Sequence, residues 1–496
     1  MSVTQTIVAL IALTLIIKII WRATLPNLIQ KAQPGLEFIP QHFNPVVQQF
    51  TKWLLPFLLR FRVRPWLPSG ISRIEVKNAE VLAELYQQFQ AGKIRFLMAF
   101  RHPEVDDPLC MFYLLSRVMP KVARQKGIRL QYPIHSHFIY DRGMTLWVGD
   151  WLGWFFSRLG GIPVRRGKRL DLHGVHNARD LFANGKMPIA VAPEGATNGH
   201  SGIVSPLEPG VAQLGFWCVE DLVKANRREE VFIVPIGIQY RYVEPPWLKL
   251  DWLLSKLEAD CGLSVQPIAE SEMSQKEEIY YQRLLCIADA LLTEMEDFYR
   301  RFYHQDLPKH IVTDESVSIN QALITRLQRL LNTALKVAEQ YFGLQSQGNF
   351  IDRCRRLEEA GWSYIYREDL RDLNALPPLQ RGLADWVAAE ADMRMRHMRL
   401  VESFVAVTEN YIQEKPTAER FAETALLIFD VVARIKSNTK IPGRPRLGWR
   451  LAQITVGEPI SVTERWSNYQ TNRNSARLAV TQLTQDLHDA LEKLIT

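Results

Sequence analysis

The sequence predicts an α/β fold, in which a layered, mostly parallel sheet flanked by helices is joined to a large all-helical region. From Lys93 to Tyr240, apolar strand-like runs alternate with helical patterns, as they do in proteins with parallel sheets. From Pro246 onward this alternation gives way to long stretches of helical periodicity. A strand and turn return at 450–462, followed by an amphipathic helix at 475–495. Two kinds of folded region are therefore expected in one chain.

The elements of the alternating region can be placed in order. Strands are expected at 94–100, 162–166, 187–193 and 231–240, with helices at 108–118, 173–184 and 210–226. Pro108 suits the first turn of its helix, where the missing N–H is not needed. Pro235 removes a hydrogen-bond donor from its strand, which predicts an edge strand or a bulge.

The helical region carries its own end signals. The segment Ser274 to Glu277 has the pattern of a capping box, which predicts a helix from there through Phe302. A second helix is expected from about Ser318 to Phe342, with Gly343 as its left-handed cap. Longer helices are expected at 379–413 and 417–436.

Length and composition narrow the class of protein. With 496 residues, 47% of them hydrophobic and 23% charged, the chain is globular and long enough for two or three domains. The net charge of +7 suits an anionic small substrate or membrane surface, and the aromatic residues lie among apolar runs, which argues against nucleic acid as a partner. The five cysteines form no C-x-x-C pair, which argues against a disulfide framework or structural zinc and favours a reducing compartment.

The N-terminal segment predicts membrane association. Ile7 to Ile17 is an uncharged apolar run, with Lys18, Arg22 and Lys31 on its C-terminal side. This arrangement predicts a membrane anchor with the rest of the chain on the cytoplasmic side, and a buried core helix is the alternative. Residues 50–68 mix aromatic and basic residues, as interfacial segments do, although a linker packed on the domain has the same composition. A further aromatic group could assist them: Trp147, Trp151, Trp154, Phe155 and Phe156.

Polar residues follow three of the expected strands. His102 and Asp107 come directly after the first, where a histidine can act as a base near neutral pH and Asp107 could otherwise serve as a helix N-cap. Arg165 and Arg166 end the second and continue into Lys168 and Arg169; such a cluster can bind a phosphate, or it is a solvated basic loop. Glu194 and Gly195 follow the third, where they could contact a polar ligand or form an ordinary turn.

In this order the motifs resemble the glycerolipid acyltransferase family, whose best-known member is 1-acylglycerol-3-phosphate acyltransferase. The family's His-x-x-x-x-Asp motif is matched by His102 and Asp107. Its second motif, a glycine, an apolar strand and an arginine, is matched by Gly161, Arg165 and Arg166. Its third motif, Phe-Pro-Glu-Gly-Thr-Arg, is matched only by Pro193, Glu194 and Gly195, and its fourth, a strand with proline, by Pro235.

The resemblance implies an O-acyltransferase that moves a fatty acyl group from acyl-CoA or acyl carrier protein to the hydroxyl of a lysophospholipid or related membrane glycerolipid. It implies that His102 is the general base, that Asp107 orients its ring, and that Arg165 and Arg166 bind the acceptor with Glu194 and Gly195. No metal and no resident cofactor is expected. Ala192, Ala196 and Thr197 depart from the third motif, and the missing arginine puts lysophosphatidic acid itself in doubt as the acceptor.

The resemblance also divides the chain. Family members close their domain with a Gly-Glu-Pro-Ile turn and a helix soon after the fourth motif, whereas here that turn stands at 457–460. We therefore expect residues 452–457 to form a strand in the sheet that carries His102 and Pro235. The alternative is a separate C-terminal domain that starts near 251. The expected domains are an anchoring or interfacial segment at 1–69, an acyltransferase α/β domain at 70–250, a helical insertion at 251–447, and a closing strand and helix at 448–496.

Two other functions remain open from the sequence. A non-catalytic membrane or lipid-binding protein could keep the fold with a degraded third motif. A metal-dependent hydrolase could use His135, His137 and Asp141, since two histidines at i and i+2 can share one face of a strand.

Overall fold

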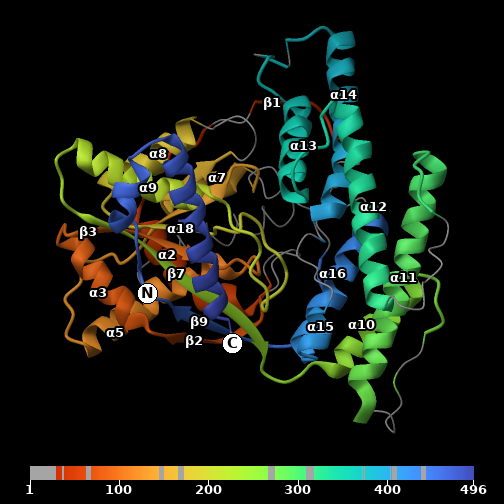
Figure 1. Ribbon diagram of the computed structural model, residues 1–496, viewed down its shortest axis with the longest axis horizontal. Helices are drawn as coiled ribbons and strands as arrows, with labels where there is room; N and C mark the ends of the chain where they lie inside the picture. The colour runs from red at the N-terminus through yellow and green to blue at the C-terminus, as the bar shows by residue number, and fades with distance from the viewer. Residues whose placement is uncertain are drawn as a thin grey trace, which may run out of the picture.

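A single sheet organises the first half of this computed structural model and the end of its chain (Figure 1). The structure describes residues 30–35, 38–62, 69–144, 150–165, 172–265, 268, 274–308, 318–370, 372–373, 375–402, 404, 410–436 and 443–495. Among them, the main sheet has the strand order β2–β9–β7–β3–β6–β4–β5, with β10 also paired to β7. The strands are β2 (Ile71–Lys77), β3 (Ile94–Phe100), β4 (His137–Asp141), β5 (Gly161–Val164), β6 (Ile189–Val191), β7 (Glu230–Tyr242), β9 (Arg450–Val456) and β10 (Ile460–Ser461). All pairs are parallel except those of β7 with β9 and β10, so the predicted α/β class is confirmed.

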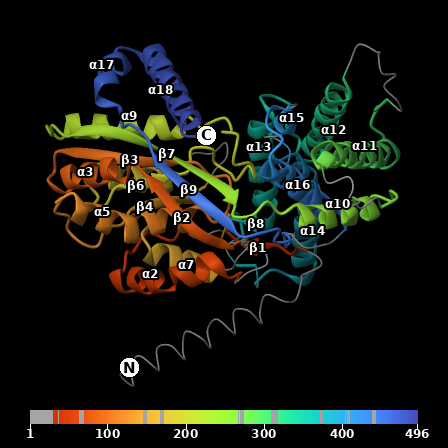
Figure 2. The same cartoon turned by 90° about the horizontal axis from the view of Figure 1, so that it is seen from below.

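Helices cover both faces of this sheet. Along β3 the side chains alternate: Phe96 and Met98 enter one apolar core, whereas Leu97 and Ala99 enter the other. The first core packs against α3 (Ala79–Gln90), α4 (Asp107–Tyr113), a π-helical turn (Leu114–Val118) and α5 (Met119–Gln125). The second packs against α8 (Leu172–Asn184), α9 (Gly210–Lys224) and α18 (Arg473–Lys493), with the short α17 (Trp466–Tyr469) beside them. Helices α2 (Pro45–Arg60) and α7 (Asp150–Arg158) lie together below the sheet in Figure 2.

The chain leaves the sheet after β7 and returns to it at β9. Tyr242 pairs with Arg450 across the two strands, and Val243 N–H donates to the Trp449 carbonyl at 2.9 Å. The helical segment between these strands therefore starts and ends at the same end of two neighbouring strands. The strand predicted at 452–457 is confirmed, because β9 lies between β2 and β7. The domain boundaries around it stay predictions.

The helical segment stands beside the sheet (Figure 2). Its helices are α10 (Trp247–Asp260), α11 (Lys276–Phe302), α12 (Ile319–Phe342), α13 (Phe350–Ile365), α14 (Pro378–Glu402), α15 (Tyr411–Glu414) and α16 (Ala418–Lys436). One apolar cluster joins α10, α11 and α16, and another joins α11 to α14. Two short strands, β1 (Gln33–Pro34) and β8 (Tyr366–Arg367), pair the segment before α2 with the end of α13.

The helical ends were predicted with mixed success. Ser318 caps α12 through the Gln321 N–H, and Gly343 ends it with φ of 64°, as predicted. The capping box at Ser274 is wrong, because α11 begins at Lys276 and makes no side-chain cap bond. The long helix expected at 379–413 is also wrong, because α14 ends at Glu402 and the short α15 follows separately.

Pro235 lies in the interior strand β7, so the expected edge strand is wrong. Its carbonyl accepts the Gly457 N–H at 2.9 Å, where β9 has just ended and β10 has not yet begun. A residue's N–H and carbonyl point to the same side of a strand, so the missing donor of Pro235 faces this gap. The proline therefore costs the sheet no ladder hydrogen bond.

Replacement of Phe421 by alanine should strongly destabilise the helical segment. The ring of Phe421 is fully buried in α16 against Trp247 of α10 and Tyr280 of α11. We expect Phe421→Ala to lower the unfolding free energy by about 3–5 kcal/mol, because it leaves a cavity among three helices. Phe302→Ala, at a ring that is 70% exposed, should change it by only about 0.5 kcal/mol. Equal effects in chemical denaturation would contradict this packing.

Candidate active site

His102 and Asp107 meet across the loop between β3 and α4. The ring nitrogen Nδ1 of His102 lies 3.0 Å from Asp107 Oδ2. The Asp107 side chain is fully buried, whereas that of His102 is 20% exposed. Asp107 is the first residue of α4 rather than its N-cap, and it makes no cap bond with the helix, so the N-cap alternative is wrong. The five-residue spacing thus joins an accessible imidazole to a buried carboxylate.

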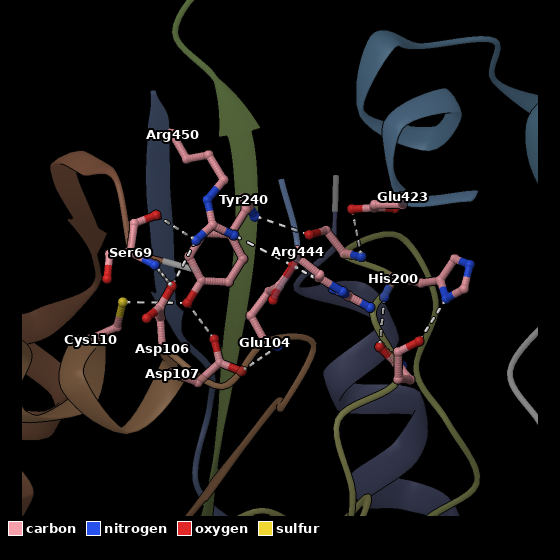
Figure 3. Close-up of polar contacts among 12 residues, drawn as sticks. Ser69, Glu104, Asp106, Asp107, Cys110, His200, Tyr240, Glu423, Arg444 and Arg450 are labelled. Carbon is pink, nitrogen blue, oxygen red and sulfur yellow. Dashed lines mark hydrogen bonds and ion pairs between the residues drawn. The ribbon is translucent and has the colours of Figure 1, made fainter. Parts of the chain in front are cut away.

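Three donors converge on the Asp107 carboxylate. His102 Nδ1 donates to Oδ2. Figure 3 shows the other two donors: the Glu104 N–H donates to Oδ2 at 2.8 Å, and the Tyr240 hydroxyl donates to Oδ1 at 2.5 Å. Burial raises the pKa of Asp107, and these three hydrogen bonds oppose that rise by favouring the carboxylate. Because the carboxylate accepts, we assign the ring proton to Nδ1. Nε2 of His102 is then the basic nitrogen.

A second buried carboxylate holds the backbone of His102. Glu194 Oε1 accepts the His102 N–H at 2.8 Å, while its Oε2 accepts Ser205 N–H at 2.9 Å and Asn198 Nδ2 at 3.0 Å. The neighbouring Arg101 guanidinium, also fully buried, lies 3.8 Å from Glu194. Glu194 is therefore bonded to protein groups on both oxygens, and it ties the loop after β6 to the loop after β3.

Gly195 forms the turn that aims Glu194 inward. Its φ is +75°, and a Cβ atom there would lie 1.9 Å from Glu208 Oε1. Its N–H donates to the Ala192 carbonyl at 3.2 Å. Only glycine fits this turn without displacing the neighbouring side chains.

The closing strand also reaches the histidine loop. Arg450, the first residue of β9, donates from Nη2 to Asp106 Oδ2 at 2.7 Å and to the Ser69 carbonyl at 3.0 Å (Figure 3). Its Nη1 lies 3.4 Å from Glu104. Arg450 and Tyr240 were not among the site residues predicted from the sequence. Arg450 starts one predicted strand and Tyr240 ends another, and neither pattern indicates which residue it would contact.

Comparison with known proteins fits this geometry. Residues 73–239 match the family described as Acyltransferase. This part of the chain is an acyltransferase domain. The match spans β2 to most of β7 and includes His102, Asp107, Glu194 and Pro235, so the resemblance noted from the four motifs is confirmed there. No curated protein matches the chain.

Arg165 of the acyltransferase domain lies apart from His102. Arg165 follows β5, which is three strands from β3 and hence roughly 14 Å away at the usual strand spacing. Its Nη1 donates to Glu368 Oε1 of the helical segment at 2.8 Å. Arg166, Lys168 and Arg169 lie outside the described residues. The structure thus brings His102, Asp107 and Glu194 together. Arg165 also follows the carboxyl end of a parallel strand, where it is paired with Glu368.

The two histidines of the hydrolase alternative serve the backbone. Nε2 of His135 lies 2.8 Å from the Leu159 carbonyl, and Nδ1 of His137 lies 3.0 Å from that of Gly160. Burial lowers the pKa of both imidazoles, and of His135 to about 4. These contacts fix the end of α7 against β4 and give no support to a metal site.

A third buried carboxylate links the acyltransferase domain to the helical segment. Glu423 of α16 accepts the Ser201 N–H at 3.0 Å and the Tyr411 hydroxyl. Burial raises the pKa of Glu423 to about 7. The carboxyl group therefore changes its charge near neutral pH at the junction between the two regions.

Stability should fall with pH through Glu423. An unfolded glutamate has a pKa of about 4.3, so the raised native pKa stabilises the fold below pH ~4.3 and is lost as pH rises through 7. We expect the unfolding free energy of wild type, relative to Glu423→Gln, to decline over this window. His200 nearby has its pKa lowered to about 4 and acts in the opposite sense, but it is present in both proteins and cancels. Parallel pH profiles in chemical denaturation would refute the assignment.

Proposed function

We propose that the acyltransferase domain moves a fatty acyl group from a thioester donor to the hydroxyl of a lysophospholipid or related glycerolipid, with His102 as general base. The observation that carries this proposal is the accessible imidazole of His102, held at Nδ1 by the buried carboxylate of Asp107. Family membership supports acyl transfer as the reaction class. The finer substrate follows from the order of the motifs.

The chemistry needs one proton carrier. Nε2 of His102 takes the proton of the acceptor hydroxyl as its oxygen attacks the thioester carbonyl. The carbon–sulfur bond then breaks, and the imidazolium returns the proton to the leaving thiolate. A carboxylate beside Nδ1 stabilises the imidazolium formed between these steps. Such a base contributes about 10²–10⁴-fold, and the reaction as written uses no metal or resident cofactor.

The remaining site residues act around this pair. We assign Arg165, with Arg166 beside it in the sequence, to the anionic group of the acceptor, since Glu368 is 60% exposed and a phosphate can displace it. Glu194 and Gly195 support the substrate site by positioning, because both oxygens of Glu194 are bonded to protein groups. The donor is acyl-CoA or acyl carrier protein.

Membrane association is supported by one face of α2. Four apolar side chains on it are 37–74% exposed: Val46, Phe50, Trp53 and Phe57. Their spacing of three and four residues places them on one side of the helix. The C-cap residue Phe61 is also exposed, and its ring centroid lies 5.0 Å from that of Phe57. Such a face suits the surface of an anionic bilayer.

Among the described residues no helix combines the length and apolarity needed to cross a bilayer. The apolar run at 7–17 and Trp147 lie outside them. We propose attachment to a membrane, with the active site on the cytoplasmic side.

Removal of the base should abolish turnover. We expect His102→Ala to lower kcat/KM by about 10²–10⁴-fold and Asp107→Asn to cost nearly as much, with circular dichroism unchanged. His173→Ala, an exposed histidine of α8, is the matched control. The measurement is acyl transfer to a panel of lysolipids, with products identified by mass spectrometry. Wild-type rates in His102→Ala would refute the mechanism, and a wild type that binds lipid without turnover would favour the non-catalytic alternative.

Loss of Arg165 should affect the acceptor more than the donor. We expect Arg165→Ala to raise the KM for an anionic acceptor by about tenfold, the value of a lost charge-assisted contact, while the KM for the acyl donor stays near wild type. Arg73→Ala, an exposed arginine of β2 paired with Glu75, serves as control. An unchanged acceptor KM would leave Arg165 with only its ion pair to Glu368.

Polar substitutions on α2 should weaken membrane binding. We expect Trp53→Ser combined with Phe57→Ser to shift the protein toward the soluble fraction in flotation with anionic vesicles, because two exposed apolar side chains are lost. Trp386→Ser, at a 67% exposed tryptophan of α14, should leave flotation unchanged. Equal flotation of all three proteins would count against this face.

A further inference from the structure

An apolar cavity, partly open to solvent, lies in the helical segment and is walled mainly by α11, α12 and α16. Its volume is about 160 Å³, and leucine, isoleucine, methionine and alanine side chains make up most of the wall. Representative members are Leu284, Leu292, Leu327, Leu331 and Leu427. The cavity is comparable to apolar cavities of about 150 Å³ that bind benzene, so it has room for a stretch of hydrocarbon.

The apolar lining of this cavity is unfavourable where it meets solvent. Apolar surface left in contact with water costs free energy roughly in proportion to its area. The long helices α11 and α12 nevertheless leave this space between them while burying tight clusters on either side. Its walls offer few polar partners to water, so a hydrocarbon suits it better.

One end of the cavity belongs to the loop that holds the candidate active site. His200 lines the cavity, and its ring packs edge-to-face on Tyr411 with 4.8 Å between centroids. The His200 carbonyl accepts a bond from Arg101 Nη2 at 3.1 Å, and Arg101 directly precedes His102. Gly199 N–H donates to the Pro103 carbonyl at 3.0 Å, on the other side of His102. Residues 199–200, at one end of the cavity, are therefore hydrogen-bonded to the residues on both sides of His102.

We propose that this cavity binds the hydrocarbon chain of a fatty acyl group whose reacting end lies at His102. The proposal rests on the proposed acyl transfer and adds the place of the chain, which is built by the helical segment rather than by the acyltransferase domain. The chain enters past His200, and its methyl end lies between α11 and α12. Contact with successive CH₂ groups then makes affinity rise with chain length.

The test uses the full-length protein and binding rather than turnover. Ala288 lines the cavity on α11, and Ala290, two residues on, points away from it with similar exposure. Ala288→Phe fills the cavity, and Ala290→Phe is the matched control. Binding of palmitate and octanoate is measured by calorimetry below their micelle concentrations. Wild type and Ala290→Phe should bind palmitate at least about tenfold tighter than octanoate, and Ala288→Phe should lose most of that preference.

A second variant guards against misfolding of Ala288→Phe. Leu327→Gln, at a partly exposed position of the α12 wall, adds polarity without volume and should also lower palmitate affinity. No chain-length preference in wild type, or a preference that survives in both variants, would overturn the proposal. A preference that appears only after removal of residues 1–22 would overturn it too, by assigning the cavity to that apolar segment.

The same assay separates the two sources of the chain and the two proposals. Competition by a palmitoyl thioester supports the proposal, because its acyl group is the one that reacts at His102. Competition by a palmitoyl lysophospholipid alone would assign the cavity to the acceptor and overturn the proposal. Failure of the two proposals is distinguishable. Full transfer activity in His102→Ala would refute the proposed base, whereas the preference of the wild type for palmitate over octanoate tests the cavity independently.

Discussion

The pairing of β7 along both of its edges is the constraint on which the rest of the molecule depends. Residues 230–236 pair with β3, and residues 236–242 pair with β9. One strand therefore joins the strand before His102 to the strand that follows the helical segment. The first pairing sets where His102 leaves the sheet. The second pairing brings Arg450 within hydrogen-bond distance of Asp106. It also places Tyr240 where its hydroxyl donates to Asp107.

Buried carboxylates hold the loops of the candidate active site. Asp106, Asp107 and Glu194 have no exposed side-chain surface, and each accepts bonds from several donors. Burial of an unpaired carboxylate would be strongly unfavourable, so these networks fix a single arrangement of the loops. The accessible group they leave is the imidazole of His102. The rigidity that the proposed base requires thus comes from buried carboxylates bonded to protein groups.

The features that could be predicted from the sequence are those that depend on residues close together in the chain. The strand at 94–100 was placed correctly because its apolar run is long, and His102 with Asp107 because their spacing crosses one loop. Partners distant in sequence left no local pattern: Tyr240 lies 133 residues from Asp107, and Arg450 lies 344 residues from Asp106. Pro235 was misplaced for the same reason, because the gap it faces is formed by Gly457. Arg165 shows the converse case, in which a local basic pattern hid an acidic partner at Glu368.

The position of β9 has a consequence for how the chain folds during synthesis. Among the described strands, β2 is hydrogen-bonded only to β9, although it is made almost 380 residues earlier. Until residues 450–456 leave the ribosome, β2 has no partner and the second half of β7 has an open edge. The helical segment is complete by then, so it can fold first and hold the two ends of the gap together. Sheets closed by such distant pairings form slowly, and their exposed edges invite association with other chains. We therefore expect a nascent chain of this protein to expose these edges until residues 450–456 emerge.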